Sequence, residues 1–134
     1  MKDEINKGKG RILLMDDDDM VRRVSGKILE HLGYEVLPAE EGRKAIEIYQ
    51  KAMDDKNPVD VVLLDLTVPG GMSGQETFVE LIKIDKNVKA VICSGYSSDP
   101  VISQYKDAGF KAVVQKPYTV EKLNFIISQV ISEP

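Results

Sequence analysis

Five short apolar runs alternate along this chain with segments whose apolar residues recur at helical spacing. The runs lie at residues 12–15, 34–37, 59–66, 88–93 and 110–114, and the helical segments lie at 21–32, 45–53, 78–82, 101–108 and 120–130. Strict alternation of this kind, with short connections, is typical of βαβ units. The sequence therefore predicts an α/β fold with a parallel sheet and helices on both faces.

The third run is apolar throughout except for Asp60 and Asp65, which suits a strand buried on both faces of a parallel sheet. Right-handed crossovers leave few layouts for five such strands, and the doubly wound order 2-1-3-4-5 is the leading one. Its switch point lies between strands one and three, and ligands bind there at the carboxyl ends of the strands.

Length and charge restrict the functions open to the chain. Its 134 residues fit one domain, which we expect over residues 11–133 after a polar, flexible lead-in at 1–10. A formal net charge of −4 argues against nucleic-acid binding. The single cysteine, Cys93, cannot form an internal disulfide, and no apolar run approaches the roughly 18 residues of a membrane span. We expect a soluble, cytoplasmic protein without a signal peptide.

Polar side chains stand where four of the predicted strands end. Asp16 and Asp17 directly follow the first strand, Asp65 ends the third, Ser94 follows the fourth and Lys116 follows the fifth. Because these strand ends share one edge of a parallel sheet, the side chains should converge at the switch point.

Three converging carboxylates repel one another, at a cost of about 4 kcal/mol for two charges about 4 Å apart at an effective dielectric constant near 20. Lys116 supplies one compensating charge, and a divalent cation would supply two more. Oxygen ligands favour Mg²⁺, Mn²⁺ or Ca²⁺ over zinc, and Mg²⁺ commonly shares a site with a phosphate. Since a carboxylate can act as a nucleophile, the residues suggest a metal-assisted phosphoryl acceptor.

The run of four aspartates at residues 16–19 also has a simpler interpretation, as a solvated charge cluster and helix cap. We expect Asp18 and Asp19 to have that role. The presence of Asp65 and Lys116 favours the site interpretation for Asp16 and Asp17.

Four motifs, in order and spacing, resemble the response-regulator receiver family of two-component signalling. They are LLMDDD at 13–18, LLDLTVP at 63–69, CSG at 93–95 and VQKP at 114–117. The resemblance extends from about Arg11 to the end of the chain. It implies the flavodoxin-like (βα)5 receiver fold. The loop at 69–74 weakly resembles receiver modules of hybrid sensor kinases.

The resemblance implies that Asp65 accepts a phosphoryl group from a phosphohistidine. It also implies that Asp17 binds Mg²⁺ directly and that Asp16 does so mainly through water. Asp65 and the backbone carbonyl of Thr67 would be further ligands. Mn²⁺ is the alternative ion.

The same resemblance gives roles to the other two strand ends. Ser94 would hydrogen-bond a phosphoryl oxygen and move toward it on activation. Lys116 would pair with the acceptor carboxylate and then with the phosphoryl group, and the peptide bond to Pro117 would be cis.

The implied partners are a sensor histidine kinase or histidine phosphotransfer protein and a downstream effector. The effector would dock on the face built from the helix at 101–108, the strand at 110–114 and the last helix, and a homodimer could use the same face. At this face Val113 stands where the family usually carries an aromatic switch residue, for which Tyr96 and Tyr118 are the candidate replacements.

Two other functions compete with a signalling switch that has at most slow self-dephosphorylation. A phosphatase of the haloacid-dehalogenase type also uses an aspartyl nucleophile and Mg²⁺, but it needs a second aspartate at the position of Thr67. A flavodoxin-like flavin or nucleotide binder needs a phosphate-binding loop after the first strand, where this chain has aspartates. Both therefore rank below the switch.

Overall fold

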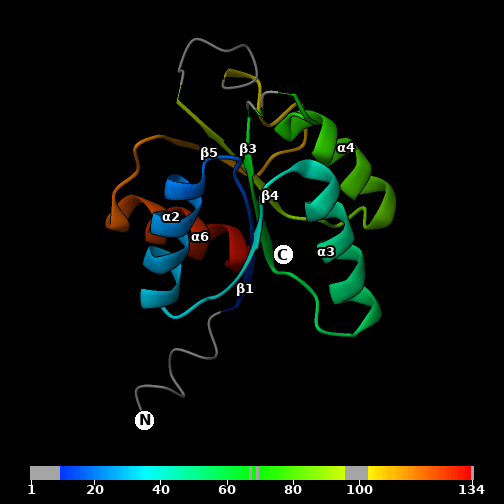
Figure 1. Ribbon diagram of the computed structural model, residues 1–134, viewed down its shortest axis with the longest axis horizontal. Coiled ribbons are helices and arrows are strands. Elements are labelled where there is room, and N and C mark those ends of the chain that lie inside the picture. Colours follow the sequence, from blue (N-terminus) through cyan, green and yellow to red (C-terminus); the bar gives the residue numbers. More distant parts are fainter. Residues whose placement is uncertain (1–9, 67, 69, 96–102, 134) are drawn as a thin grey trace.

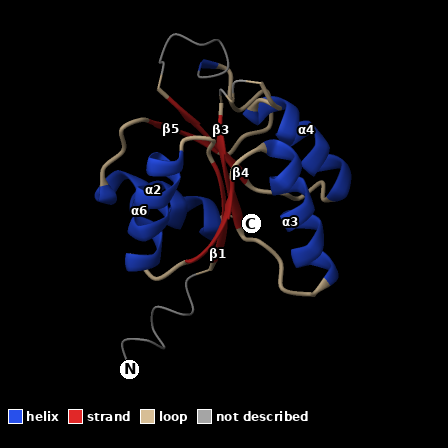
Figure 2. Ribbon diagram, in the orientation of Figure 1, coloured by secondary structure: helices blue, strands red, loops and turns tan. Residues whose placement is uncertain are grey.

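The computed structural model describes residues 10–66, 68, 70–95 and 103–133, and five strands and four helices are assigned within them. The strands are β1 (Arg11–Met15), β2 (Glu35–Ala39), β3 (Val61–Asp65), β4 (Ala90–Ser94) and β5 (Ala112–Gln115). The helices are α2 (Asp19–His31), α3 (Gly42–Asp54), α4 (Gly74–Ile84) and α6 (Val120–Ser132). The sheet forms a central layer with α2 and α6 on one side and α3 and α4 on the other (Figures 1 and 2).

All five strands pair in parallel in the order β2-β1-β3-β4-β5, which confirms the predicted doubly wound sheet. From β1 the chain first adds β2 on one side of the sheet and then adds β3, β4 and β5 on the other side, so β1 and β3 flank the switch point. In their register Met15 stands beside Leu64, so Asp16 and Asp65, one residue further along each strand, face the same edge. The switch point is therefore at the predicted position.

Alternation along the central strands produces two apolar cores. Leu13 and Met15 pack into the layer under α3 and α4, whereas Ile12 and Leu14 pack into the layer under α2 and α6. Successive strand residues point to opposite faces, so both sets must be apolar when both faces are covered. This explains why the strands read as continuous apolar runs.

The helix boundaries follow ordinary capping chemistry. Asp18 caps α2 through its side chain, as predicted, and Thr119 caps α6 in the same way. Ser73 and Glu76 form a reciprocal capping box at the start of α4. Gly33 follows α2 with a φ of 102°, a left-handed conformation that ends the helix.

The predicted helix at 101–108 is described only from residue 103 on, where Ser103 is helical and residues 104–109 form turns. Tyr105 and Ala108 lie in turns, and Val101 and Ile102 lie outside the described residues. Gly109 has a φ of 101°, and the backbone N–H of Phe110 donates to the carbonyl of Tyr105 at 3.0 Å. This closing turn occupies residues predicted for the fifth strand, which starts at Ala112 instead of Phe110.

Two smaller differences concern exposure and length. Val120 begins the apolar stripe of the predicted helix at 120–130, a pattern that predicts burial in the core. It is nevertheless 39% exposed, because it is the first residue of α6 and lies at the end of the helix. The third strand is shorter than its apolar run and covers Val61–Asp65. None of the helices assigned within the described residues has the length and apolar character needed to cross a bilayer.

Candidate functional site

The carboxyl edge of the sheet carries the predicted polar residues. Asp16 directly follows β1, Asp65 is the last residue of β3, and Lys116 directly follows β5. Ser94 is the last residue of β4 instead of the first one after it. Strand ends that are far apart in the sequence thus supply groups to one edge, as expected for a doubly wound sheet.

Three carboxylates meet at this edge. One oxygen from each of Asp16, Asp17 and Asp65 lies within 4.8 Å of the others. Asp16 and Asp65 are buried, at 2% and 6% exposure, whereas Asp17 is exposed and gives the cluster an open side. All of the donor atoms are oxygens, which fits a hard divalent cation.

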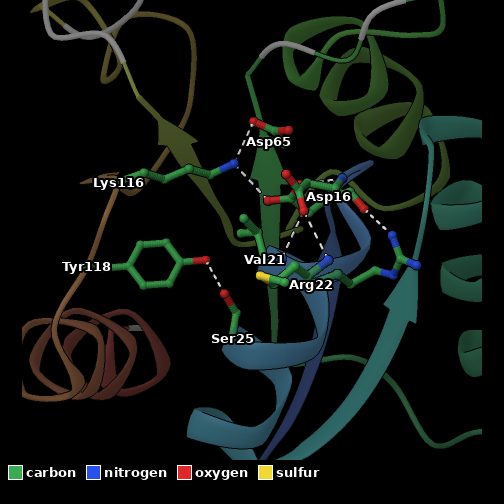
Figure 3. Close-up of polar contacts among 9 residues, drawn as sticks. Asp16, Val21, Arg22, Ser25, Asp65, Lys116 and Tyr118 are labelled. Atoms are coloured by element: carbon green, nitrogen blue, oxygen red, sulfur yellow. Dashed lines mark hydrogen bonds and ion pairs between the residues drawn. The ribbon is translucent and has the colours of Figure 1, made fainter.

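Lys116 reaches this cluster from β5 (Figure 3). Its Nζ donates to Asp16 Oδ2 at 2.7 Å and to Asp65 Oδ1 at 3.1 Å. Three carboxylates and one ammonium leave a formal charge of −2, so a cation is favoured here even with the lysine in place.

The two buried partners influence each other's protonation. Burial raises the pKa of Asp65 to about 6, against the opposing effect of the Lys116 ammonium, and the negative charge of Asp16 adds to the rise. Burial alone would lower the pKa of Lys116, but its hydrogen bond to Asp16 and the charge of Asp65 outweigh burial and raise it. At neutral pH the pair is therefore mainly a carboxylate and an ammonium.

Asp16 is held firmly by the start of α2. Its Oδ1 accepts from the backbone N–H of Asp18 at 2.9 Å, and its carbonyl accepts from Arg22 Nη1 at 2.7 Å. Asp19 pairs with the same arginine on the exposed side of the helix. With one Asp16 oxygen on Asp18 and the other on Lys116, the exposed Asp17 is the carboxylate most open to a metal ion.

The backbone of Asp65 is supported by α4. Gly74, the first residue of that helix, donates its N–H to the carbonyl of Leu66 at 3.2 Å. A Cβ on Gly74 would stand only 2.6 Å from the carbonyl oxygen of Asp65 and 2.7 Å from Ile92 Cδ1. Only glycine lets the helix approach the acceptor strand this closely.

Three contributions escaped the sequence reasoning. Arg22 could have been found, because it lies within one helical turn of the aspartate run. The approach of Gly74 to Asp65 and the contact between Ser25 and Tyr118 depend on tertiary distances, for which the sequence contains no local signal.

The remaining predicted residues are Thr67, Tyr96, Val113 and Pro117. Thr67 and Tyr96 lie outside the described residues. Val113 is half-buried and packs against the core under α3 and α4. The peptide bond between Lys116 and Pro117 is cis, as the resemblance implied.

A doubly wound parallel sheet with an acidic cluster and a lysine at its carboxyl edge defines a class of α/β signalling domain, and comparison with known proteins identifies the family. The sequence model of the response regulator receiver domain matches residues 12–128. The chain belongs to this family and is a receiver domain of two-component signalling.

Individual relatives agree with this assignment. Chemotaxis protein CheY of Thermotoga maritima is 34% identical over 119 residues, which cover 85% of this chain and 94% of that protein. Sporulation initiation phosphotransferase F of Bacillus subtilis is 28% identical over 84% of this chain and 86% of its own length. A receiver domain structure from Clostridium thermocellum superposes with a TM-score of 0.79 at 28% identity, covering 91% of this chain and 94% of that one.

Family membership decides between the functions that the sequence left in competition. Receiver domains are signalling switches, so the comparisons favour the switch over the haloacid-dehalogenase and flavodoxin families. The acidic cluster at Asp16, Asp17 and Asp65 is compatible with the Mg²⁺ pocket of this family.

Proposed function

We propose that this chain is a phosphoacceptor switch in which Asp65 receives a phosphoryl group from a phosphohistidine of a sensor kinase or histidine phosphotransfer protein. The observation that carries the proposal is the bridge from Lys116 Nζ to both Asp16 and Asp65 within a cluster of three carboxylates. A partly buried lysine that contacts two carboxylates can neutralise added negative charge as well as its present partners.

The transfer exchanges one bond to phosphorus for another. A carboxylate oxygen of Asp65 attacks the phosphorus atom, and the P–O bond forms as the P–N bond to the donor imidazole breaks. The imidazole leaves with the electron pair of the broken bond and ends as neutral histidine after taking up a proton. Asp65 is mainly ionised at neutral pH, so its oxygen is available for attack.

The chain's residues fit a Mg²⁺ ion. Asp17 would hold it directly, Asp16 through water and Asp65 through a carboxylate oxygen, with the backbone carbonyl of Thr67 as a further ligand. The exposed position of Asp17 and the all-oxygen donor set support Mg²⁺, with Mn²⁺ as an alternative. When bound, the ion would neutralise charge on the transferring phosphoryl group.

The remaining residues stabilise the product. Lys116 would keep its contact with the acceptor side chain and pair with a phosphoryl oxygen. Ser94, buried at the end of β4 with 2% exposure, would donate its hydroxyl to another phosphoryl oxygen. We expect self-dephosphorylation of the product to be slow at most.

The output would pass to the face formed by the predicted helix at 101–108, β5 and α6, where an effector or a second copy of the chain would dock. On α6, Phe125 is 63% exposed. We place the domain at residues 11–133 and its activity in the cytoplasm.

Incubation with Mg²⁺ and acetyl phosphate tests the proposal. Intact-protein mass spectrometry should detect one added phosphoryl group, and omission of Mg²⁺ should prevent its addition. If the chain gains no phosphoryl group from acetyl phosphate or from any phosphorylated kinase, the proposal is wrong.

The substitution Asp17→Asn should weaken Mg²⁺ binding by at least about tenfold, because it removes the most open ligand. The same change should raise the melting temperature of the metal-free protein, since it relieves repulsion within the cluster. Calorimetric titration with Mg²⁺ and thermal unfolding in a chelator measure the two effects.

Asp19→Asn is the matched control for Asp17→Asn. It makes the same charge change two residues away, outside the carboxylate cluster, and should leave Mg²⁺ affinity unchanged. A lower melting temperature for metal-free Asp17→Asn would contradict the repulsion within the cluster.

A further inference from the structure

A hydrogen bond joins α2 to the loop between β5 and α6. The hydroxyl groups of Ser25 and Tyr118 lie 2.6 Å apart, although the two residues are 93 positions apart in the sequence (Figure 3). Ser25 is buried at 2% exposure, and Tyr118 packs against the core under α2 and α6. The bond is partly buried and joins the loop directly to the helix.

The loop carries Lys116, two residues before Tyr118. The backbone N–H of Lys116 donates to the carbonyl of Ser94 at 2.7 Å, which fixes the start of the loop on β4. The Oγ1 of Thr119 accepts from the N–H of Lys122 at 3.1 Å, which fixes its end on α6. The hydrogen bond between Tyr118 and Ser25 joins this loop to α2.

The same helix holds the other side of the ion pair. Arg22 donates to the carbonyl of Asp16 at 2.7 Å, and Asp18 caps the helix while its N–H donates to Asp16 Oδ1. Ser25 lies one helical turn after Arg22. One helix thus contacts both the segment that presents Asp16 and the loop that presents Lys116.

We propose that Ser25 and Tyr118 are positioning residues for phosphoryl acceptance: their hydrogen bond sets the distance between α2 and the Lys116 loop and so keeps Lys116 Nζ in contact with Asp16 and Asp65. This inference rests on the proposed function of Asp65. It gives Tyr118 a role through the lysine and requires no contact with the phosphoryl group.

The protonation state of Tyr118 keeps its hydrogen bond to Ser25 intact at physiological pH. Burial raises the pKa of its phenol to about 12, so the hydroxyl stays protonated across the physiological range. A phenol and a serine hydroxyl can each donate and accept, so the bond at 2.6 Å does not depend on the charge state of the acidic cluster.

Tyr118→Phe and Ser25→Ala test this inference directly, because each removes one hydroxyl and keeps most of the packing. At saturating Mg²⁺, the rate constant for phosphorylation by acetyl phosphate should fall about fivefold in each variant, as expected for the loss of one buried hydrogen bond. The double variant should show about the same fall as either single variant, since both remove the same interaction.

A second measurement uses the metal-free, unphosphorylated protein. The ammonium protons of Lys116 should exchange with water faster in Tyr118→Phe than in the wild type, as followed by NMR, because the lysine is less firmly held between its two carboxylates. A loss of stability alone would not produce this change under conditions in which both proteins are fully folded.

Tyr34→Phe is the matched control. Tyr34 belongs to the same core, and its hydroxyl lies 3.4 Å from that of Ser128 on α6, away from the acidic cluster. This variant should keep the wild-type rate and the wild-type Lys116 signal.

The NMR measurement tests the positioning role of Tyr118, and phosphorylation of the wild type tests the proposed function of Asp65. Wild-type exchange of the Lys116 ammonium in Tyr118→Phe would overturn the positioning role, whether or not Asp65 is phosphorylated. Failure of the wild type to accept a phosphoryl group would instead overturn the proposed function, and the NMR measurement would still decide whether Tyr118 positions the lysine.

Discussion

Replacing Asp65 with asparagine should abolish phosphorylation while preserving the fold. An amide oxygen is a poor nucleophile, and the amide has almost the same shape as the carboxylate, so packing at the end of β3 should be unchanged. The change also removes one of three clustered negative charges, which should make the metal-free variant at least as stable as the wild type. Intact-protein mass spectrometry after incubation with acetyl phosphate and Mg²⁺ measures the loss, and urea unfolding measures stability.

Asp19→Asn again serves as the control, because it removes an aspartate from the exposed side of α2 without touching the cluster. It should be labelled as fully as the wild type. Full labelling of Asp65→Asn would mean that another residue accepts the phosphoryl group. Loss of labelling together with unfolding would point to a structural role for Asp65 and against the expected preservation of the fold.

Gly74→Ala should destabilise the protein substantially and slow its phosphorylation. The added methyl group would stand 2.6 Å from the carbonyl oxygen of Asp65, and a backbone atom in a buried strand cannot move aside as a flexible side chain can. Overpacking of this kind typically costs about 1–3 kcal/mol. We expect about 2 kcal/mol in urea unfolding, together with slower phosphorylation because the start of α4 would be displaced from the acceptor strand.

Gly26→Ala provides a control of opposite sign. A Cβ at Gly26 would meet Val36 Cγ1 at 3.8 Å and Leu14 Cδ2 at 3.9 Å, which are ordinary contacts. Since alanine favours a helix interior over glycine, this variant should gain about 0.5–1 kcal/mol. If both replacements raise stability, helix propensity and not close approach determines the effect at Gly74.

The fold could be predicted from the sequence because the information that sets it is local and repeated. Apolar runs buried on both faces identified the strands, and right-handed crossovers then left the observed order as the leading choice. The convergence of Asp16, Asp65 and Lys116 followed from that order, since parallel strands bring their carboxyl ends to one edge.

What could not be predicted depends on contacts that join distant segments. The periodicity at residues 101–108 predicted a helix as far as Ala108, whereas Ser103 is helical and Tyr105 and Ala108 lie in the turn that leads to Gly109. The sequence alone indicates that Ser25 is an ordinary helix residue and that Tyr118 is an aromatic residue in a loop. Only the packing of the loop against α2 shows that the two hydroxyls meet.

Both ends of the described chain lie at the edge of the sheet opposite the acidic cluster. Gly10 precedes β1 and accepts a hydrogen bond from Glu35 at the start of β2, and Lys89, just before β4, donates to the carbonyls of Ile131 and Glu133. A fluorescent reporter or an affinity tag joined at Gly10 or at Glu133 would therefore be attached on the far side of the molecule from Asp17, where a phosphodonor would approach.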